Sequence, residues 1–141
     1  MIQINEFSTD TSPVFSILTL AYDQRQKSRL SVCLDNGDQA AIILPRSRSL
    51  KDGDMLKTSN GELVKVIAAK EEVSVVYSEN TLLLMKACYH LANRHTPLQI
   101  EEKSVRYQSD HVLDKMIVQL GLSVKTEQST FEPESGAYSH H

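Results

Sequence analysis

Residues 81–122 read TLLLMKACYHLANRHTPLQIEEKSVRYQSDHVLDKMIVQLGL, and this stretch decides the fold of the chain. Its first part, residues 82–93, lacks glycine and proline and repeats apolar side chains at intervals of three and four, which predicts an amphipathic helix. Pro97 prevents this helix from continuing. A second helix then restarts at Ser109-Asp110, where a side-chain acceptor precedes the apolar run, and Gly121 ends it.

Short strands flank and separate the two predicted helices. We expect two strands between the helices, at residues 98–100 and 105–107, one before the first helix at 73–77 and one after the second at 122–126. The resulting order, β-α-β-β-α-β, is that of a ferredoxin-like domain. In such a domain, two antiparallel helices lie on one face of the sheet.

Three of the five histidines, His90, His95 and His111, lie in the same stretch. Because the two predicted helices are antiparallel, the end of the first lies near the start of the second. His95 follows the first helix and His111 begins the second. We therefore expect these two histidines at the same end of the domain. His90 is one turn from Lys86 and Arg94, which indicates a solvated helix face.

The chain up to residue 69 shows only strand signals. Strands are predicted at residues 2–6, 14–21, 30–34, 40–44 and 62–69. Asn36-Gly37 lies between two apolar runs and predicts a hairpin, because a type I′ turn needs positive φ at both central positions. No helix is expected before Thr81. The predicted fold class is therefore α+β, with an N-terminal all-β domain followed by a ferredoxin-like βαββαβ domain.

The change from hairpins to helices predicts a domain boundary near residue 70. We expect a β-rich domain at residues 1–70, a ferredoxin-like domain at 71–128 and a flexible tail at 129–141, which carries His140 and His141. Domains of about 70 residues are near the lower limit for independent stability. The two halves should therefore support each other, or the protein should oligomerise.

The composition argues against several classes of protein. A net charge of −3 with dispersed basic residues argues against nucleic acid as a partner. No apolar run approaches the ~20 residues of a membrane span, and the N-terminus lacks the pattern of a secretory signal. We expect a cytoplasmic protein in which Cys33 and Cys88 are buried, reduced thiols; the alternative is a disulfide or a thiolate metal ligand. The one basic cluster, Arg46, Arg48 and Lys51, either binds an acidic partner or decorates a loop.

The histidines are the main candidates for chemistry, because imidazole binds zinc, copper and nickel. The sequence has no HxH, HExxH or CxxC spacing, so a closed site within one chain is not predicted. A single exposed histidine beside a two-fold axis supplies two ligands at once. His95 is the candidate for such a site, and His140 or His141 of the tail would complete it. The alternative is that His95 and His111 are ordinary surface or capping residues.

Sequence motifs of enzymes are not found. No serine lies in a G-x-S-x-G elbow, and there is no glycine-rich loop of the kind that holds a phosphate. Paired acids such as Glu71-Glu72 are typical of solvated turns. We therefore expect no enzyme activity.

Five strings of the sequence resemble the UreE family of urease accessory proteins, which are nickel metallochaperones. They are LPRSRSLKDGD at residues 44–54, VIAAKEEVSVV at 66–76, KACYHLANRHTPLQI at 86–100, DHVLDKMIVQLGL at 110–122 and FEPESGAY at 131–138. The similarity extends from about Leu20 to the C-terminus. The asparagine-arginine-histidine element that ends at His95 is specific to that family.

The resemblance implies a role for each domain and a set of ligands. The N-terminal domain should resemble the peptide-binding domain of a chaperone, and the C-terminal domain should bind metal and dimerise. His95 matches the histidine that pairs across the dimer, and His111 matches a secondary metal-binding histidine. Many relatives have a further histidine at the place of Gln108 or Ser109, so metal binding around His111 should be weaker in this chain.

The leading hypothesis is a cytoplasmic homodimer that binds nickel through a shared pair of His95 side chains and delivers the ion to apo-urease. Its implied partners are the urease apoprotein and the other urease accessory proteins, including the GTPase. Zinc or copper would suit the same imidazole ligands. The alternatives are a zinc, copper or nickel buffer without a delivery role, and a peptide-binding adaptor whose histidines are incidental.

Overall fold

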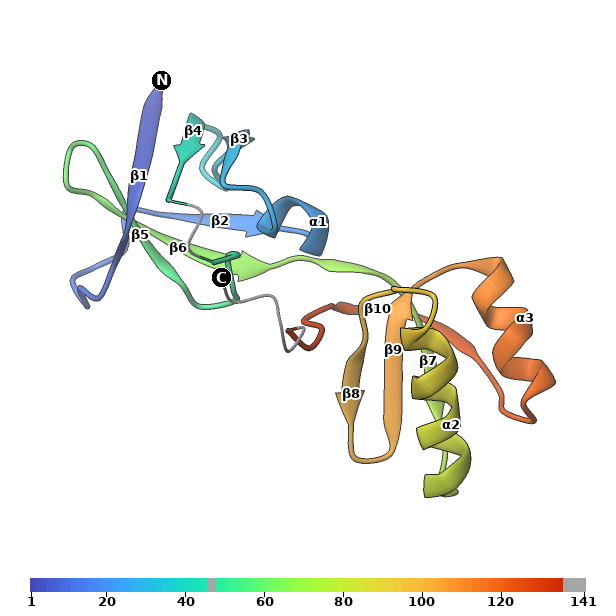
Figure 1. Cartoon of the computed structure of the whole chain (residues 1–141). Helices are drawn as coiled ribbons and strands as arrows, with labels where there is room; N and C mark the ends of the chain where they lie inside the picture. Colours follow the sequence, from blue (N-terminus) through green and yellow to red (C-terminus); the bar gives the residue numbers. More distant parts are fainter. Residues whose placement is uncertain (46–47, 136–141) are drawn as a thin grey trace. The chain divides into compact units, whose positions relative to one another are not determined.

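Two units are present in the computed structural model, at residues 1–69 and 70–135 (Figure 1). The structure describes residues 1–45 and 48–135. Each unit buries its own cluster of hydrophobic side chains. The first unit is a β-sheet and the second mixes helices with strands, which confirms the predicted α+β class.

The first unit is built from a six-stranded sheet. Its strands are β1 (Ile2–Ser8), β2 (Ser16–Leu20), β3 (Arg29–Cys33), β4 (Gln39–Ile43), β5 (Met55–Thr58) and β6 (Leu63–Ala68). Their order in the sheet is β2-β6-β5-β1-β4-β3. The backbone N–H of Asp35, just after β3, donates to the carbonyl oxygen of Ile17 in β2 at 2.8 Å. Because this bond joins the two edges of the sheet, the unit is barrel-like.

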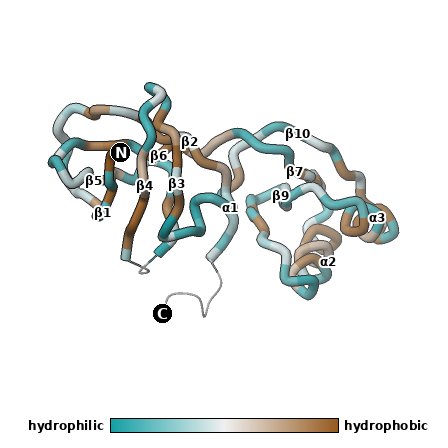
Figure 2. The backbone as a smooth tube through the Cα atoms, turned by 90° about the horizontal axis from the view of Figure 1, so that it is seen from above, coloured by the Kyte–Doolittle hydropathy of each residue, from teal (hydrophilic) through white to brown (hydrophobic). Residues whose placement is uncertain are grey.

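Alternation along the strands explains which side chains fill this unit. In β2, Ser16, Leu18 and Leu20 are buried, whereas Ile17 and Thr19 are exposed. Figure 2 shows hydrophobic stretches along β3 and β4. The core that results includes Ile4, Leu18, Val32, Ile42, Leu56 and Val66.

The predicted hairpin joins β3 and β4, which pair antiparallel. Gly37 has a φ of +96°, and its N–H donates to the carbonyl oxygen of Leu34 at 2.9 Å. The side-chain oxygen of Asn36 accepts a hydrogen bond from the N–H of Asp38 at 2.9 Å. The hairpin is confirmed, but its turn is not of type I′, because Gly37 has positive φ and Asn36 does not. The positive φ at Gly37 is what favours glycine at this position.

Two short elements of the first unit differ from the sequence prediction. One is α1 (Tyr22–Arg25), a single helical turn in a region where no helix is expected. Its last residue, Arg25, is buried and donates from Nη1 to the carbonyl oxygen of Leu20 at 2.7 Å. The other is β5, which occupies a segment that the sequence presents as polar loop. Four residues are too few to show the period of either a helix or a strand.

The second unit has the predicted βαββαβ order. Its elements are β7 (Lys70–Tyr77), α2 (Thr81–Ala92), β8 (Gln99–Glu101), β9 (Ser104–Gln108), α3 (His111–Gln119) and β10 (Lys125–Thr130). The strands form an antiparallel sheet in the order β10-β7-β9-β8. Because the first and third strands of the unit are its central pair, the arrangement is ferredoxin-like.

Both helices begin at a side-chain cap. The Asn80 side chain accepts from the N–H of Leu83 at 3.1 Å, and Asp110 Oδ1 accepts from the N–H groups of Val112 and Leu113 at 2.8 and 3.0 Å. The helices are short, with twelve residues in α2 and nine in α3. Among the residues that the structure describes, no helix is long and apolar enough to cross a membrane.

Each helix packs one apolar face against the sheet. The shared core of α2, α3 and the central strands includes Leu84, Ala87, Leu91, Val105, Tyr107, Leu113 and Ile117. Figure 2 shows the hydrophobic stretches of α2, which include the residues of this buried face. The opposite side of each helix is left exposed.

The last strand begins and ends later than predicted. The sequence prediction places it at residues 122–126, but β10 occupies Lys125–Thr130. Ser129 and Thr130, assigned to the tail from the sequence, therefore belong to the sheet. The strand reads KTEQST and has no apolar alternation, so its pairing with the buried strand β7 is what defines it.

Candidate metal-binding site

The strand register defines which loops share an end of the second unit. Gln99, the first residue of β8, lies opposite Arg106 near the end of β9. His95 precedes β8 by four residues, and His111 follows Gln108, the last residue of β9, by three. The register therefore places the His95 loop and the start of α3 at the same end of the sheet, as the topology predicts.

His95 closes the C-terminal end of α2 in an unusual conformation. Its φ is +58°, and it is the one non-glycine with positive φ in the part of the chain that the structure describes. Its N–H donates to the carbonyl oxygen of Ala92 at 2.9 Å, and its side chain is exposed. Left-handed residues at helix ends are usually glycine, because a Cβ atom there is strained. An exposed imidazole is thus held at a position where glycine would fit better.

His111 is the first residue of α3 and is also exposed. It follows the capping residue Asp110, whose carboxylate faces the backbone of the first helical turn. Its imidazole is therefore presented to solvent at the same end of the unit as His95.

The remaining histidines differ from this pair. His90 is half-buried on α2, with its ring edge-on to that of Tyr89 at a centroid distance of 5.2 Å. His140 and His141, the predicted tail ligands, lie outside the described residues. Within residues 1–45 and 48–135, no three His, Cys, Asp or Glu side chains are grouped so as to hold a metal ion. The described part of one chain thus supplies single imidazoles rather than a closed site.

Neither cysteine is fully buried, so the prediction of two buried thiols is wrong. Cys33 is exposed, and Cys88 is half-buried; both are free thiols. Cys33 lies between Val32 and Leu34, which point into the core, and the period of a strand turns it outward. Burial raises the pKa of the Cys88 thiol, which disfavours the thiolate that a metal requires.

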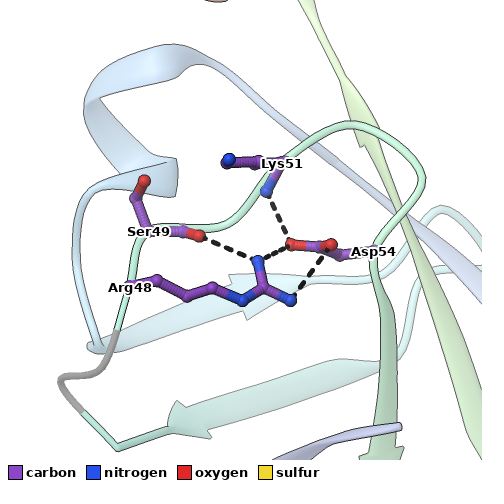
Figure 3. Close-up of polar contacts among 4 residues, drawn as sticks. All are labelled: Arg48, Ser49, Lys51 and Asp54. Atoms are coloured by element: carbon purple, nitrogen blue, oxygen red, sulfur yellow. Dashed lines mark hydrogen bonds and ion pairs between the residues drawn. The ribbon is translucent and has the colours of Figure 1, made fainter. Parts of the chain in front are cut away.

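Within the basic cluster of the first unit, Arg48 and the backbone of Lys51 bind the carboxylate of Asp54 (Figure 3). Arg48 Nη1 lies 2.7 Å from Asp54 Oδ2, and Nη2 lies 3.3 Å from Oδ1. The same carboxylate accepts from the backbone N–H of Lys51 at 2.8 Å, and the Arg48 guanidinium stacks 4.0 Å from the Phe7 ring centroid. Arg48 therefore holds a loop together, while Arg46 lies outside the described residues.

An apolar surface on α2 extends towards His95, and the sequence analysis does not identify it. Leu82, Met85 and Tyr89 are 58, 59 and 64 % exposed. Their spacing of three and four places them along one side of α2, away from the buried stripe. We call these three residues the α2 stripe. The same spacing is present in the sequence, so the sequence pattern could have identified this exposed apolar surface.

A groove runs beside the α2 stripe, between α2 and the β8–β9 hairpin. It is lined by Thr81, Leu84, Met85, Cys88, Ile100, Glu101 and Glu102. Ile100, on its far side, is 46 % exposed. The stripe, the groove and Ile100 make one continuous apolar surface on the second unit, edged by the carboxylates of the hairpin.

Comparison with known proteins identifies the family. The model of the UreE urease accessory protein N-terminal domain matches residues 3–69, and that of the C-terminal domain matches residues 71–141. The chain belongs to the UreE family of urease accessory proteins. The resemblance recognised in the sequence is therefore confirmed. UreE proteins are non-enzymatic chaperones, which agrees with the expectation that this chain is no enzyme.

UreE relatives match nearly the whole chain. The urease accessory protein UreE of Vibrio parahaemolyticus is 53 % identical over 122 residues, which cover 86 % of this chain and 77 % of the relative. The UreE protein of Shewanella halifaxensis is 46 % identical over 138 residues, which cover 98 % of this chain and 80 % of the relative. The UreE protein of Proteus mirabilis is 49 % identical over 130 residues, which cover 92 % of this chain and 81 % of the relative.

Proposed function

We propose that this UreE protein is a cytoplasmic nickel chaperone that binds nickel between the His95 side chains of two copies and delivers the ion to apo-urease. The observation that carries the proposal is the exposed His95 imidazole, held at positive φ at the end of the helix that carries the exposed α2 stripe. Family membership supplies the link to urease maturation.

A second copy is needed because nickel takes several nitrogen and oxygen ligands. One imidazole is too few for nickel. A two-fold axis beside His95 doubles the number of imidazole ligands, because each copy of the chain supplies one. We assign His140 or His141 of the tail to the remaining positions and His111 to a weaker, secondary site. Binding weakens as the pH falls, because only neutral imidazole coordinates metal.

The α2 stripe is the surface that we assign to the dimer. It runs along α2 towards the helix end that carries His95. Pairing it with its own copy about a two-fold axis parallel to α2 would bring two imidazoles near that axis. Lys86 and Arg94 on one side and Glu102 on the other are exposed at its edges. In a two-fold arrangement the basic residues of one copy face the acidic residue of the other, which suits self-association.

We assign partner binding to the first unit, in the manner of a chaperone domain that holds peptides. The partners are the urease apoprotein and the other urease accessory proteins, including the GTPase. The second unit then serves metal binding and dimerisation. This division of roles is supported by the separate cores of the two units.

Calorimetric titration with nickel chloride, with light scattering on the same sample, tests the shared site. We expect one tightly bound nickel per wild-type dimer and loss of that ion in His95→Ala. The variant should stay folded and dimeric, because an exposed side chain contributes little packing. His111→Ala should lower only weaker binding. One tight nickel per dimer in His95→Ala would contradict the proposal.

The interface is tested with Tyr89→Lys, which places a charge in the α2 stripe. We expect a monomer that has lost tight nickel binding. Val118→Lys is the matched control, because Val118 is 59 % exposed on α3 and lies outside the stripe. A dimeric Tyr89→Lys variant would reject the α2 stripe as the interface. Tight nickel binding without activation of apo-urease would instead reject delivery and leave a metal buffer.

A further inference from the structure

Part of the outer side of the first unit is apolar. Phe15, just before β2, and Ile17, within it, are 40 and 39 % exposed. In β6 the core residue Val66 lies between Lys65 and Ile67, so the alternation of a strand turns these two side chains outward. Both are half-buried. Apolar side chains therefore lie on the outside of the sheet around one lysine.

The strand register places Lys65 in the middle of this outer surface. β2, β6 and β5 are neighbours in the sheet (Figure 1). Ile17 of β2 pairs with Lys65 of β6, and Met55 of β5 pairs with the same lysine from the other side. Because neighbouring strands are about 4.8 Å apart, these three side chains form one row across the sheet. We call the outward residues Phe15, Ile17, Met55, Lys65 and Ile67 the Lys65 face.

The fold supplies no charge partner for Lys65. Within residues 1–45 and 48–135, this half-buried lysine forms no ion pair. The carboxylate of Asp54, next to Met55, is bound by Arg48 Nη1 at 2.7 Å. An ammonium group that loses water without gaining a hydrogen-bonded partner is unfavourable. The Lys65 face therefore favours the addition of a carboxylate.

Lys57, the next outward lysine of β5, has acidic neighbours. It pairs in the register with Glu6 of β1. The pKa of Asp10 is lowered by its hydrogen bonds with Ser12 and, to a lesser degree, by the positive charge of Lys57. Since Lys57 lies close to two carboxylates of its own unit, Lys65 is the lysine that is left for a partner.

We infer that the Lys65 face binds a polypeptide segment of a partner protein in which apolar side chains flank a carboxylate. The apolar side chains of the segment cover those of the Lys65 face, and its carboxylate pairs with the Lys65 ammonium group. The net charge of the chain is −3, so overall charge does not attract an acidic segment. This inference rests on the proposed assignment of partner binding to the first unit, and adds the surface and the chemistry of the partner.

Fluorescence anisotropy with two labelled synthetic peptides tests this charge preference in the full chain. One short peptide alternates leucine with glutamate, and the matched peptide alternates leucine with lysine. We expect the wild type to bind the leucine–glutamate peptide about tenfold more tightly, because only this peptide offers a carboxylate to Lys65. Equal binding of the two peptides, or binding of neither, would overturn the inference.

Substitutions of Lys65 separate charge recognition from damage to the fold. Lys65→Glu should reverse the preference, so that the leucine–lysine peptide binds more tightly, which an unfolded variant cannot do. Lys65→Met keeps the length of the side chain and should bind the two peptides equally. Lys27→Glu, at an exposed lysine outside the Lys65 face, is the control and should keep the wild-type preference. An unchanged preference in Lys65→Glu would contradict the assignment.

The apolar part of the Lys65 face is tested with Ile17→Ser. We expect this variant to bind the leucine–glutamate peptide about fivefold more weakly, because less apolar surface is removed from water. Ile43→Ser is the matched control, since Ile43 is 42 % exposed on β4 and lies outside the Lys65 face. Equal weakening in both variants would show that the peptide does not select this face.

Light scattering and nickel titration of Lys65→Glu separate this inference from the proposed function. The variant should remain dimeric and bind nickel as the wild type does, because every ligand that we propose lies outside the first unit. A monomeric variant would assign the Lys65 face to a second copy of the chain and overturn the inference. Loss of tight nickel in His95→Ala remains the test of the proposed function, so the two failures are distinguishable.

Discussion

His95 has a backbone conformation that costs the fold stability, as we expect of a residue kept for the metal site that we propose. A φ of +58° suits glycine at the end of a helix, and a side chain there costs about 1 kcal/mol. The cost persists where a function requires the side chain. The exposed imidazole at this position is therefore difficult to explain by packing.

His95→Gly should separate stability from function. We expect the free energy of unfolding to rise by about 1 kcal/mol, because glycine adopts the left-handed conformation without strain, while tight nickel binding is lost. Urea unfolding and nickel titration measure the two effects. Lys86→Gly, within α2, is the contrast and should lower stability by about 1 kcal/mol. A destabilised His95→Gly variant would show that the imidazole supports the fold.

Arg48 and Lys51 lie in the same loop, but we expect their side chains to contribute differently to the free energy of unfolding. Arg48→Ala should destabilise the protein by about 1–2 kcal/mol, because the Asp54 carboxylate loses a two-point partner and the Phe7 ring loses its stacked guanidinium. Lys51→Ala should change stability by less than about 0.5 kcal/mol, since the Lys51 contact with Asp54 is made by the backbone. Urea unfolding of both variants is the measurement. Equal effects would contradict the structural role of Arg48.

At the scale of elements, Tyr107 joins α3 to the centre of the sheet. Its ring is buried, and its hydroxyl donates to Asp114 Oδ1 in α3 at 2.5 Å. Burial, followed by the hydrogen bond to Asp114, raises the pKa of the Tyr107 phenol. The start of α3, which carries His111, is thus fixed to β9 by a half-buried hydrogen bond as well as by the apolar side chains of α3.

Tyr107→Phe should lower stability by about 1 kcal/mol near neutral pH, because Asp114 loses its donor. A phenol with a higher pKa in the folded chain than in the unfolded chain stabilises the fold below about pH 10, and this contribution is lost as the pH rises further. Unfolding free energies from about pH 8 to about pH 11 should therefore fall less steeply in Tyr107→Phe than in the wild type. Tyr89→Phe, at an exposed tyrosine, should follow the wild-type curve.

At the scale of the whole molecule, the two units have separate hydrophobic cores, and every ligand that we propose lies in or after the second. Residues 70–141 alone should therefore fold, dimerise and bind nickel. Circular dichroism, light scattering and nickel titration of this fragment test the division. A folded fragment without nickel binding would show that the first unit supplies ligands.

The sequence by itself determined the βαββαβ order, the hairpin at Asn36-Gly37, the acceptor that caps the second long helix and the family. These features depend on residues close together in the chain: the period of a helix, the acceptor before it, the glycine in a turn. The proposal of His95 as a metal ligand has the same local origin, since its neighbours Asn93 and Arg94 carry the family signature.

Only the tertiary structure decided the features that depend on distant partners. β10 is a strand because β7 lies beside it, Arg48 is held by Asp54, and Cys33 is exposed because its neighbours fill a core. Two hydrogen bonds after β10 join residues 33 and 36 positions apart, Glu132 with Gln99 and Glu134 with Leu98. Such contacts form only after the chain has folded around them, so a local pattern in the sequence carries no trace of them.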